Sequence, residues 1–289
     1  MRGDGARPCP ACPAHDGEHD ISEGNTVLEK IVGGELPPVI LVDFAMFSVA
    51  DTMTTLMGVH GSGRAIYRVD AVQDLETHGA MSIDRLAELY TREIAELAEF
   101  ASPPAGVLGY CSAATLALEI ANRLGDGGHA PQVVLVEPTW LTTDLIGQEL
   151  ANLRTSLGAT GDPPAEITPA SVLQTLTGDL VTKLAAEGMP ESEIDTCVTM
   201  LTDRYAAWFG FLFATAEAAV PTPRTPVSLV ISGDSDKEPA PGWTPAQCAL
   251  VRVDVPAGEF LGSEAVRRQI LRLIDQPHER HQEPRHEHR

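Results

Sequence analysis

Short apolar runs alternate with helical repeats along the first half of the chain. Runs with the length and continuity of strands buried on both faces of a sheet lie at residues 39–43, 65–69, 106–110 and 132–136. Apolar residues recur at helical spacing over residues 48–59, 82–100 and 113–124. This alternation predicts a mostly parallel sheet with helices on both faces, which is the α/β class.

The alternation stops after Glu137. Residues 140–219 are helical by pattern, and strands are expected again at 227–232 and 251–255, before a last helix at 263–275. A helical insertion within a parallel sheet is typical of a lid over a binding site. We therefore expect one domain over residues 37–276 with a helical lid at about 140–219, a disordered leader at 1–36 and a disordered tail at 277–289.

Charge and composition narrow the function classes. The 289 residues carry a net charge of −21, with a pI near 4.7. This charge argues against nucleic acid and anionic membranes as partners. No run of about 18 apolar residues occurs, so no segment is expected to span a bilayer. Residues 1–20 lack the apolar core of a signal peptide, and we expect a cytoplasmic protein.

The cysteines do not indicate a scaffold or a metal site. Five cysteines are too few for a disulfide framework in a chain of this size. Cys9, Cys12 and His15 have the spacing of half a zinc site, but no second pair of ligands follows. We expect neither a metal nor another cofactor, and we assign this segment to the leader.

The candidate chemistry lies at residues 109–113, with the sequence GYCSA, between an expected strand and an expected helix. Small residues two positions either side of Cys111 allow a sharp turn that exposes the thiol at the carboxyl edge of the sheet. The helix N-terminus behind the turn favours a thiolate and offers backbone N–H groups to an oxyanion. The alternative is that Cys111 is a small buried apolar residue.

Three segments together resemble a known family. They are Pro37-Pro38 before the first expected strand, VLGYCSAATLALEIANRL at 107–124, and APQVVLVE at 130–137. These segments resemble the thioesterase domains of polyketide and nonribosomal peptide synthases, whose elbow reads G-x-S-x-G. The resemblance covers residues 37–137 and, with fewer matches, 226–275. It implies the α/β-hydrolase fold, and it does not fix the lid, which varies in such enzymes.

The resemblance assigns roles to individual residues. The nucleophile position holds Cys111 in place of serine, and Glu137 occupies the position of the acid after the next strand. Asp234 or Asp236 is a second choice for the acid.

The oxyanion loop departs from the family pattern, because residues 43–47 read DFAMF where the family has H-P-x-x-G. The resemblance implies that the Ala45 and Ser112 N–H groups bind the oxyanion. Met46, Phe47 and Tyr110 are then expected to contact the substrate.

The general base is the largest departure. The family places histidine in a V-P-G-x-H-F segment, and residues 255–260 read VPAGEF, with Glu259 at the histidine position. A carboxylate of ordinary pKa is a weak base for a thiol. His78, which follows a strand in an expected loop at 73–81, is the core histidine on the Cys111 side of the sheet. We expect it to be a surrogate base if it reaches Cys111.

Three functions are compatible with these residues. We favour an enzyme that takes an acyl group onto Cys111 and completes transfer, cyclisation or release, since thioester-to-thioester exchange is nearly balanced in energy. Its partner would be an acyl thioester or a polyketide or peptide substrate, presented free or on a carrier protein. The alternatives are a non-covalent acid/base catalyst, cyclase-like, that uses Glu137 and Glu259, or an inactive thioesterase-like binding protein.

An aromatic-rich cluster lies late in the helical insertion, at residues 208–213. Core packing is the favoured explanation. The alternative is that the cluster lines a pocket for an apolar acyl or polyketide chain.

Overall fold

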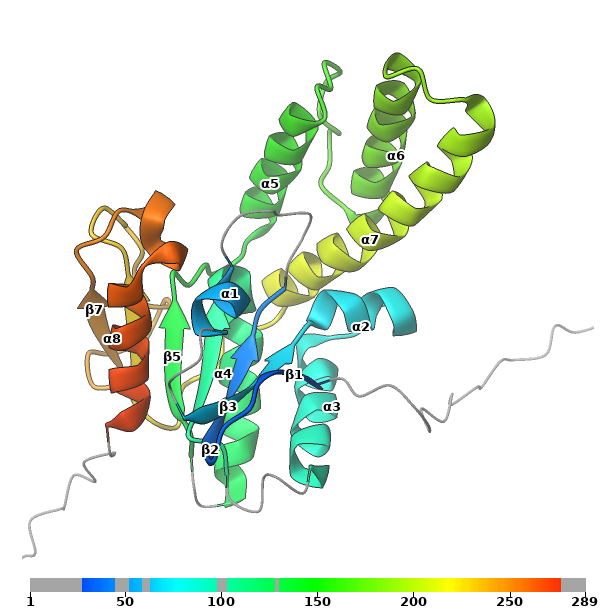
Figure 1. Ribbon diagram of the computed structural model, residues 1–289. Coiled ribbons are helices and arrows are strands. Elements are labelled where there is room, and N and C mark those ends of the chain that lie inside the picture. The colour runs from blue at the N-terminus through cyan, green and yellow to red at the C-terminus, as the bar shows by residue number, and fades with distance from the viewer. Residues whose placement is uncertain (1–27, 45–51, 59–62, 98–102, 128–129, 277–289) are drawn as a thin grey trace, which may run out of the picture.

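The computed structural model describes residues 28–44, 52–58, 63–97, 103–127 and 130–276. Within these ranges, seven strands form one sheet in the order β1-β3-β2-β4-β5-β6-β7 (Figure 1). The strands are β1 (Leu28–Val32), β2 (Leu36–Val42), β3 (Arg64–Val69), β4 (Gly106–Tyr110), β5 (Gln132–Val136), β6 (Val227–Ile231) and β7 (Cys248–Arg252). Only β1 runs antiparallel to its neighbour, β3, and the other pairs are parallel. The mostly parallel sheet confirms the predicted α/β class.

The N-terminal boundary differs from the prediction. Residues 28–36 were expected in a disordered leader, but Leu28–Val32 forms the edge strand β1, with Leu28 and Val32 buried. A five-residue edge strand with two buried side chains is too short to stand out from a polar leader by its pattern. Residues 1–27 and 277–289, which include the Cys9 to His15 segment, lie outside the described residues.

Eight helices surround the sheet in the described part of the chain. They are α1 (Met53–Met57), α2 (Ala71–His78), α3 (Ile83–Glu96), α4 (Ala114–Leu124), α5 (Thr143–Ser156), α6 (Pro169–Ala186), α7 (Glu191–Glu217) and α8 (Glu264–Asp275). The helix expected from residue 82 begins there, because Ser82 caps α3 by accepting the Arg85 N–H at 3.2 Å. Pro169 is the first residue of α6, a position that suits its fixed φ.

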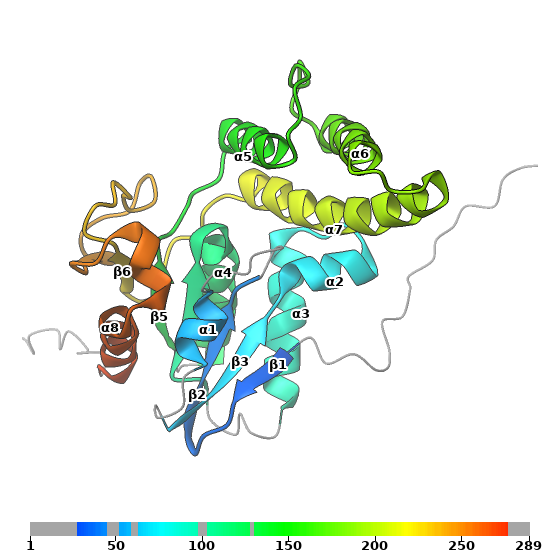
Figure 2. The same ribbon diagram turned by 45° about the horizontal axis from the view of Figure 1, so that its top comes forward.

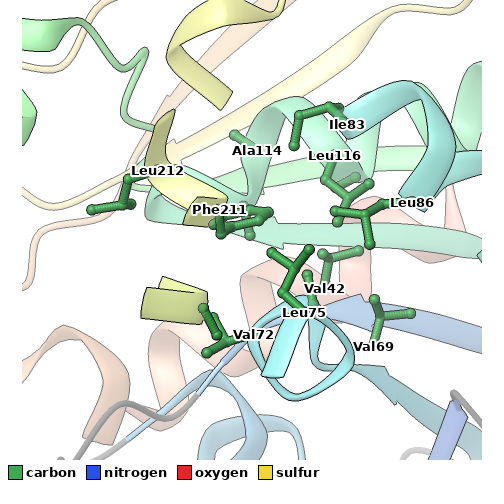
Figure 3. Close-up of a cluster of buried hydrophobic side chains, with 14 of the residues drawn as sticks. Val42, Val69, Val72, Leu75, Ile83, Leu86, Ala114, Leu116, Phe211 and Leu212 are labelled. Atoms are coloured by element: carbon green, nitrogen blue, oxygen red, sulfur yellow. The ribbon is translucent and has the colours of Figure 1, made fainter. Parts of the chain in front are cut away.

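Alternate residues along the strands build two hydrophobic clusters. Ile40 and Val42 of β2 face one cluster with α3, α4 and part of α7, whereas Val39 and Leu41 face the other with α1 and α8. Figure 3 shows the first cluster, in which Phe211 of α7 lies among side chains of the core. Helices therefore cover both faces of the sheet, and the lid shares its core with the sheet.

The insertion predicted at 140–219 forms α5, α6 and α7. Arg154 of α5 is 7% exposed and pairs with Asp179 of α6 at 2.7 Å, which joins two of these helices. The 27 residues of α7 span about 40 Å at 1.5 Å per residue. Figure 2 shows α7 lying across α2, with α5 and α6 on its outer side.

The last predicted strand is displaced. It was expected at 251–255 and lies at Cys248–Arg252, because this edge strand exposes Ala249 and Leu250 and lacks a buried apolar run. The final helix begins at Glu264 and ends at Asp275, as its pattern indicates.

Candidate active site

Cys111 lies in a sharp turn directly between β4 and α4. Its φ is 51°, in the left-handed region that residues other than glycine seldom adopt. A short 3₁₀ turn, Cys111–Ala113, leads into α4. At Gly109 a Cβ would lie 2.6 Å from the Ala117 Cβ, so the strand and the helix approach too closely for any larger residue. This is the geometry of a nucleophile elbow.

The Cys111 thiol contacts a threonine that follows β5. Cys111 Sγ lies 3.4 Å from Thr139 Oγ1, and the Thr139 N–H donates to the Cys111 carbonyl oxygen at 3.1 Å. Lys237, which follows β6, donates from Nζ to the same Thr139 hydroxyl at 2.5 Å. Sequence reasoning missed both Thr139 and Lys237. Their available signal was their position, since each follows a parallel strand at the edge that carries Cys111.

Glu137 anchors the loop that carries Lys237. Its Oε1 accepts the Ser232 N–H at 2.5 Å and its Oε2 accepts the Ser235 hydroxyl at 2.9 Å. The Ser235 hydroxyl oxygen in turn accepts the Lys237 N–H at 3.3 Å. Glu137 also has a positive φ, 46°, at the end of β5. Glu137 therefore directly follows β5, and both of its carboxylate oxygens bind the loop after β6.

A cavity of about 420 Å³ opens over the thiol. Its lining comes from the elbow, the ends of β5 and β6, and the 3₁₀ segment Ala257–Gly262: Tyr110, Cys111, Glu137, Lys237, Ala257, Gly258, Phe260, Leu261 and Gly262. Glu259 is exposed and is absent from this lining, although both of its neighbours line the cavity. The described residues thus bring Tyr110, Cys111 and Glu137 together, without Glu259.

No protein-family model and no curated protein matches this sequence. Solved structures do. The NocB thioesterase domain from the nocardicin cluster covers 86% of this chain and 100% of its own length, with a TM-score of 0.51 and 17% identity. The match to YbtT, a type II thioesterase from the yersiniabactin NRPS/PKS pathway, covers 86% of this chain and 98% of YbtT, with a TM-score of 0.54 and 15% identity. The match to AB3403, a four-domain nonribosomal peptide synthetase, covers 87% of this chain and 20% of AB3403, with a TM-score of 0.57 and 16% identity.

The chain has the thioesterase-like α/β-hydrolase fold. The predicted fold is therefore confirmed, and Cys111 lies at the turn between β4 and α4 of that fold.

Tyr110 and Asp43 flank the elbow on the β2 side of the hydrolase fold. Burial raises the pKa of Tyr110 to about 12, and the nearby Cys111, Asp43 and Glu137 add to this effect. Burial also raises the pKa of Asp43, although hydrogen bonds from the Thr54 N–H and hydroxyl, at 3.0 and 3.2 Å, oppose it. Tyr110 therefore remains a neutral phenol at physiological pH.

The predicted oxyanion loop lies partly outside the described residues. Ala45, Met46 and Phe47 fall there, so their roles stay predictions. Ser112 is buried in the 3₁₀ turn before α4, and its oxyanion role also stays a prediction.

His78 is not among the residues that line the Cys111 cavity. It is exposed, and its Nδ1 lies 3.1 Å from the Asp74 carbonyl oxygen. The expectation of a loop at 73–81 was wrong. Asp70 caps the helix α2, which ends at His78 and has Gly79 as its C-cap. The structure thus places His78 on a helix end instead of in the site.

Asp234 and Asp236, the second choices for the acid, are both exposed. Asp234 accepts the Ala257 N–H at 2.9 Å, and this hydrogen bond lowers the pKa of its carboxyl. Asp234 therefore holds the 3₁₀ segment that forms one wall of the cavity.

A second cavity, of about 980 Å³, lies between α7 and the segment that joins α2 to α3. Its lining includes Phe209, Gly210 and Phe213 of α7 but not Cys111. Phe211 instead packs edge-on against Phe44, with ring centroids 5.1 Å apart. The aromatic cluster thus divides: Phe211 belongs to the core, and Phe209 and Phe213 are core residues that also border a cavity.

Among the described residues, no helix is long and apolar enough to cross a membrane. Nor do any three His, Cys, Asp or Glu side chains of the described ranges lie close enough together to hold a metal ion.

Proposed function

We propose that the protein is a thioesterase-like enzyme. Cys111 takes an acyl group from a substrate thioester and passes it to an acceptor. The observation that carries this proposal is the elbow: a cysteine held at φ 51°, with its sulfur in contact with a hydroxyl, at the floor of a cavity. A left-handed backbone at a residue other than glycine costs about 1–2 kcal/mol. Such strain is characteristic of functional sites.

The chemistry is a thioester exchange. The Cys111 sulfur attacks the carbonyl carbon of the substrate thioester, a new S–C bond forms, and the carbonyl π electrons move to oxygen. When the carbonyl re-forms, the bond to the leaving sulfur breaks, and the leaving thiolate takes up the proton that Cys111 released. In this proposal the backbone N–H groups of the 3₁₀ turn before α4, beginning with Ser112, stabilise the oxyanion.

The proposed substrate is an acyl, polyketide or peptide thioester, free or bound to a carrier protein. Support comes from the likeness to YbtT of an NRPS/PKS pathway and to a synthetase domain in AB3403. The NocB thioesterase domain forms a covalent complex with a fluorophosphonate nocardicin G analogue. A cysteine nucleophile favours transfer or cyclisation over simple hydrolysis, because the two thioesters are nearly equal in energy.

The location of Glu259 disfavours the non-covalent alternative. That mechanism needs Glu137 and Glu259 to share the site, yet Glu259 is exposed outside the cavity and both Glu137 oxygens bind Ser232 and Ser235. We therefore assign Glu137 to positioning the loop that carries Lys237.

The test is intact-protein mass spectrometry after incubation with a series of acyl-N-acetylcysteamine thioesters. We expect an acyl adduct in the wild type and in Cys197→Ala, and none in Cys111→Ala. Cys197 is the matched control, because it is a partly exposed free cysteine in α7, remote from the cavity lining. The absence of any adduct from the wild type across acyl chain lengths would refute the proposal and favour a binding protein.

A further inference from the structure

A cysteine nucleophile needs a group that takes its proton, and no histidine lines the described cavity. The titratable groups of that lining are Tyr110, Cys111, Glu137 and Lys237. Tyr110 is unsuited to accept a proton, because it is already protonated. Glu137 is committed, since each of its oxygens accepts a hydrogen bond from the loop after β6. Lys237 remains.

Lys237 reaches the sulfur through one hydroxyl group. Its Nζ is 2.5 Å from Thr139 Oγ1, which is 3.4 Å from Cys111 Sγ. A hydroxyl accepts and donates at once, so the ammonium can donate to the threonine oxygen while the threonine hydroxyl donates to the sulfur. Thr139 is also held through its main chain, by its N–H bond to the Cys111 carbonyl.

We infer that Lys237, acting through the Thr139 hydroxyl, holds the proton that Cys111 releases and so maintains the sulfur as a thiolate. During acyl transfer the S–C bond forms, the leaving sulfur takes a proton from the Lys237 ammonium, and the acceptor later returns a proton to the amine. Lys237 and Thr139 thus fill the role for which the described lining of the cavity offers no histidine. The role of Lys237 in acyl turnover rests on the proposed function, whereas its role in maintaining the Cys111 thiolate does not.

The loop after β6 holds Lys237 in place. The Lys237 N–H donates to Ser235 Oγ, which itself donates to Glu137. Arg252 of β7 donates to the carbonyl oxygens of Ser232, Gly233 and Ser235, at 3.1, 3.2 and 2.6 Å. No carboxylate among the described residues lies within ion-pair range of Lys237 Nζ, and its hydrogen bond there goes to Thr139. Glu137 is therefore a positioning residue for the lysine.

Lysine suits this role better than arginine does. An arginine side chain does not release its proton in proteins, whereas a lysine amine can. The chain has only three lysines, Lys30, Lys183 and Lys237, and one of the three lies at the thiol. Lys183 pairs with Glu187 on α6 and supplies a matched control.

The other charged groups near Lys237 have separate partners or face solvent. Asp234 binds the Ala257 N–H, and Arg252 binds the three carbonyls of the loop. Asp236 and Glu259 are exposed. Among the charged groups described here, Lys237 is therefore the one that contacts Thr139, the hydrogen-bond partner of the thiol.

The experiment measures the rate of iodoacetamide alkylation of Cys111 between pH 5 and 10, resolved by peptide mass spectrometry. Lys237→Met and Thr139→Val are expected to slow alkylation about tenfold at pH 7 and to move the rise in rate about one pH unit higher. Thr139→Ser and Lys183→Met are expected to follow the wild type. Cys197, alkylated in the same samples, is the internal reference for a folding defect.

Lys237→Arg separates charge from proton transfer. It keeps a cation beside Thr139, so alkylation of Cys111 is expected to stay within about threefold of the wild type. Acyl turnover is expected to fall at least tenfold, because arginine does not accept the proton back. Full turnover in Lys237→Arg would overturn the proton-holding role, and unchanged Cys111 profiles in Lys237→Met and Thr139→Val would overturn the inference altogether. A lysine-dependent thiolate without any acyl adduct would refute the proposed function alone.

Discussion

Cys111 and Thr139 lie 28 residues apart in the chain, yet they meet through two contacts, one between side chains at 3.4 Å and one between main chains at 3.1 Å. The strands that precede them, β4 and β5, are parallel neighbours, so both residues leave the sheet at the same edge. The elbow is therefore coupled to the loop after β5, and through Lys237 to the loop after β6.

Glu137→Gln is expected to lower stability by about 1–2 kcal/mol. The amide keeps the size of the side chain but has only one oxygen, so either the Ser232 N–H or the Ser235 hydroxyl loses its acceptor. Urea denaturation followed by circular dichroism measures the change. Glu259→Gln is the control, because its exposed side chain predicts a change within about 0.5 kcal/mol. Equal losses in the two variants would contradict the anchoring role of Glu137.

Gly109→Ala is expected to destabilise the protein by about 1–3 kcal/mol through overpacking. Its new Cβ would lie 2.6 Å from the Ala117 Cβ and 3.1 Å from the Ala114 Cα, where β4 meets α4. Gly178→Ala provides the comparison, since a Cβ there meets nothing within 4 Å in the interior of α6. That variant is expected to gain about 0.5–1 kcal/mol from helix propensity. Thermal denaturation of both proteins tests the pair, and a stable Gly109→Ala would mean that the elbow is looser than described.

Asp74→Asn is expected to stabilise the protein at neutral pH. Burial raises the pKa of Asp74 to about 6 from 3.8, so the folded protein binds this proton more tightly than the unfolded chain does. The resulting stability is complete below pH 3.8 and is lost as the pH rises through about 6. Asparagine is always neutral and still offers an oxygen to the Tyr90 hydroxyl.

The gain at pH 7 is expected to be about 1 kcal/mol, after allowance for the partial exposure of Asp74. It should vanish near pH 4, where the wild-type carboxyl is largely protonated. Denaturant titrations at pH 4, 5.5 and 7 measure the difference. A gain that does not depend on pH would contradict the raised pKa.

Phe260→Leu is expected to widen the cavity at Cys111 and to lower the stability of the protein only moderately. Phe260 is 1% exposed and lines the cavity while it packs with α1 and α8. Truncation to alanine should cost about 3–5 kcal/mol, and the change to leucine about 1–2 kcal/mol. Under the proposed function, Phe260→Leu should form adducts with bulkier or branched acyl thioesters more readily than the wild type, relative to acetyl. An unchanged acyl preference would mean that Phe260 does not limit the site.

Local patterns predicted the parts of the fold that local physics controls. Apolar runs indicated β2 to β6, because strands buried on both faces must be apolar throughout. Small residues around Cys111 indicated the elbow, because the steric demand of that turn acts over a short stretch of chain, from Gly109 to Ala117. The edge strands β1 and β7 were missed or displaced, since an edge strand exposes half of its side chains and has a weaker pattern.

The surroundings of the thiol could not be predicted in the same way. Glu259 was inferred from its place in a motif, but a 3₁₀ segment exposes it and turns its neighbours to the cavity. His78 was inferred from the correct edge of the sheet, but α2 carries it to an exposed helix end. Position along the chain indicates an edge of the sheet, and it does not decide which side chains meet there.

The sequence by itself determined the α/β alternation, the helical insertion and a cysteine at the elbow. Only the tertiary structure decided that Thr139 contacts that cysteine and that Lys237 contacts Thr139. The order β4-β5-β6 places three strand ends side by side, and hydrogen bonds across that edge join residues 28 and 98 positions apart. Such contacts depend on the packing of the whole sheet, because no local pattern encodes the order in which the strands lie side by side.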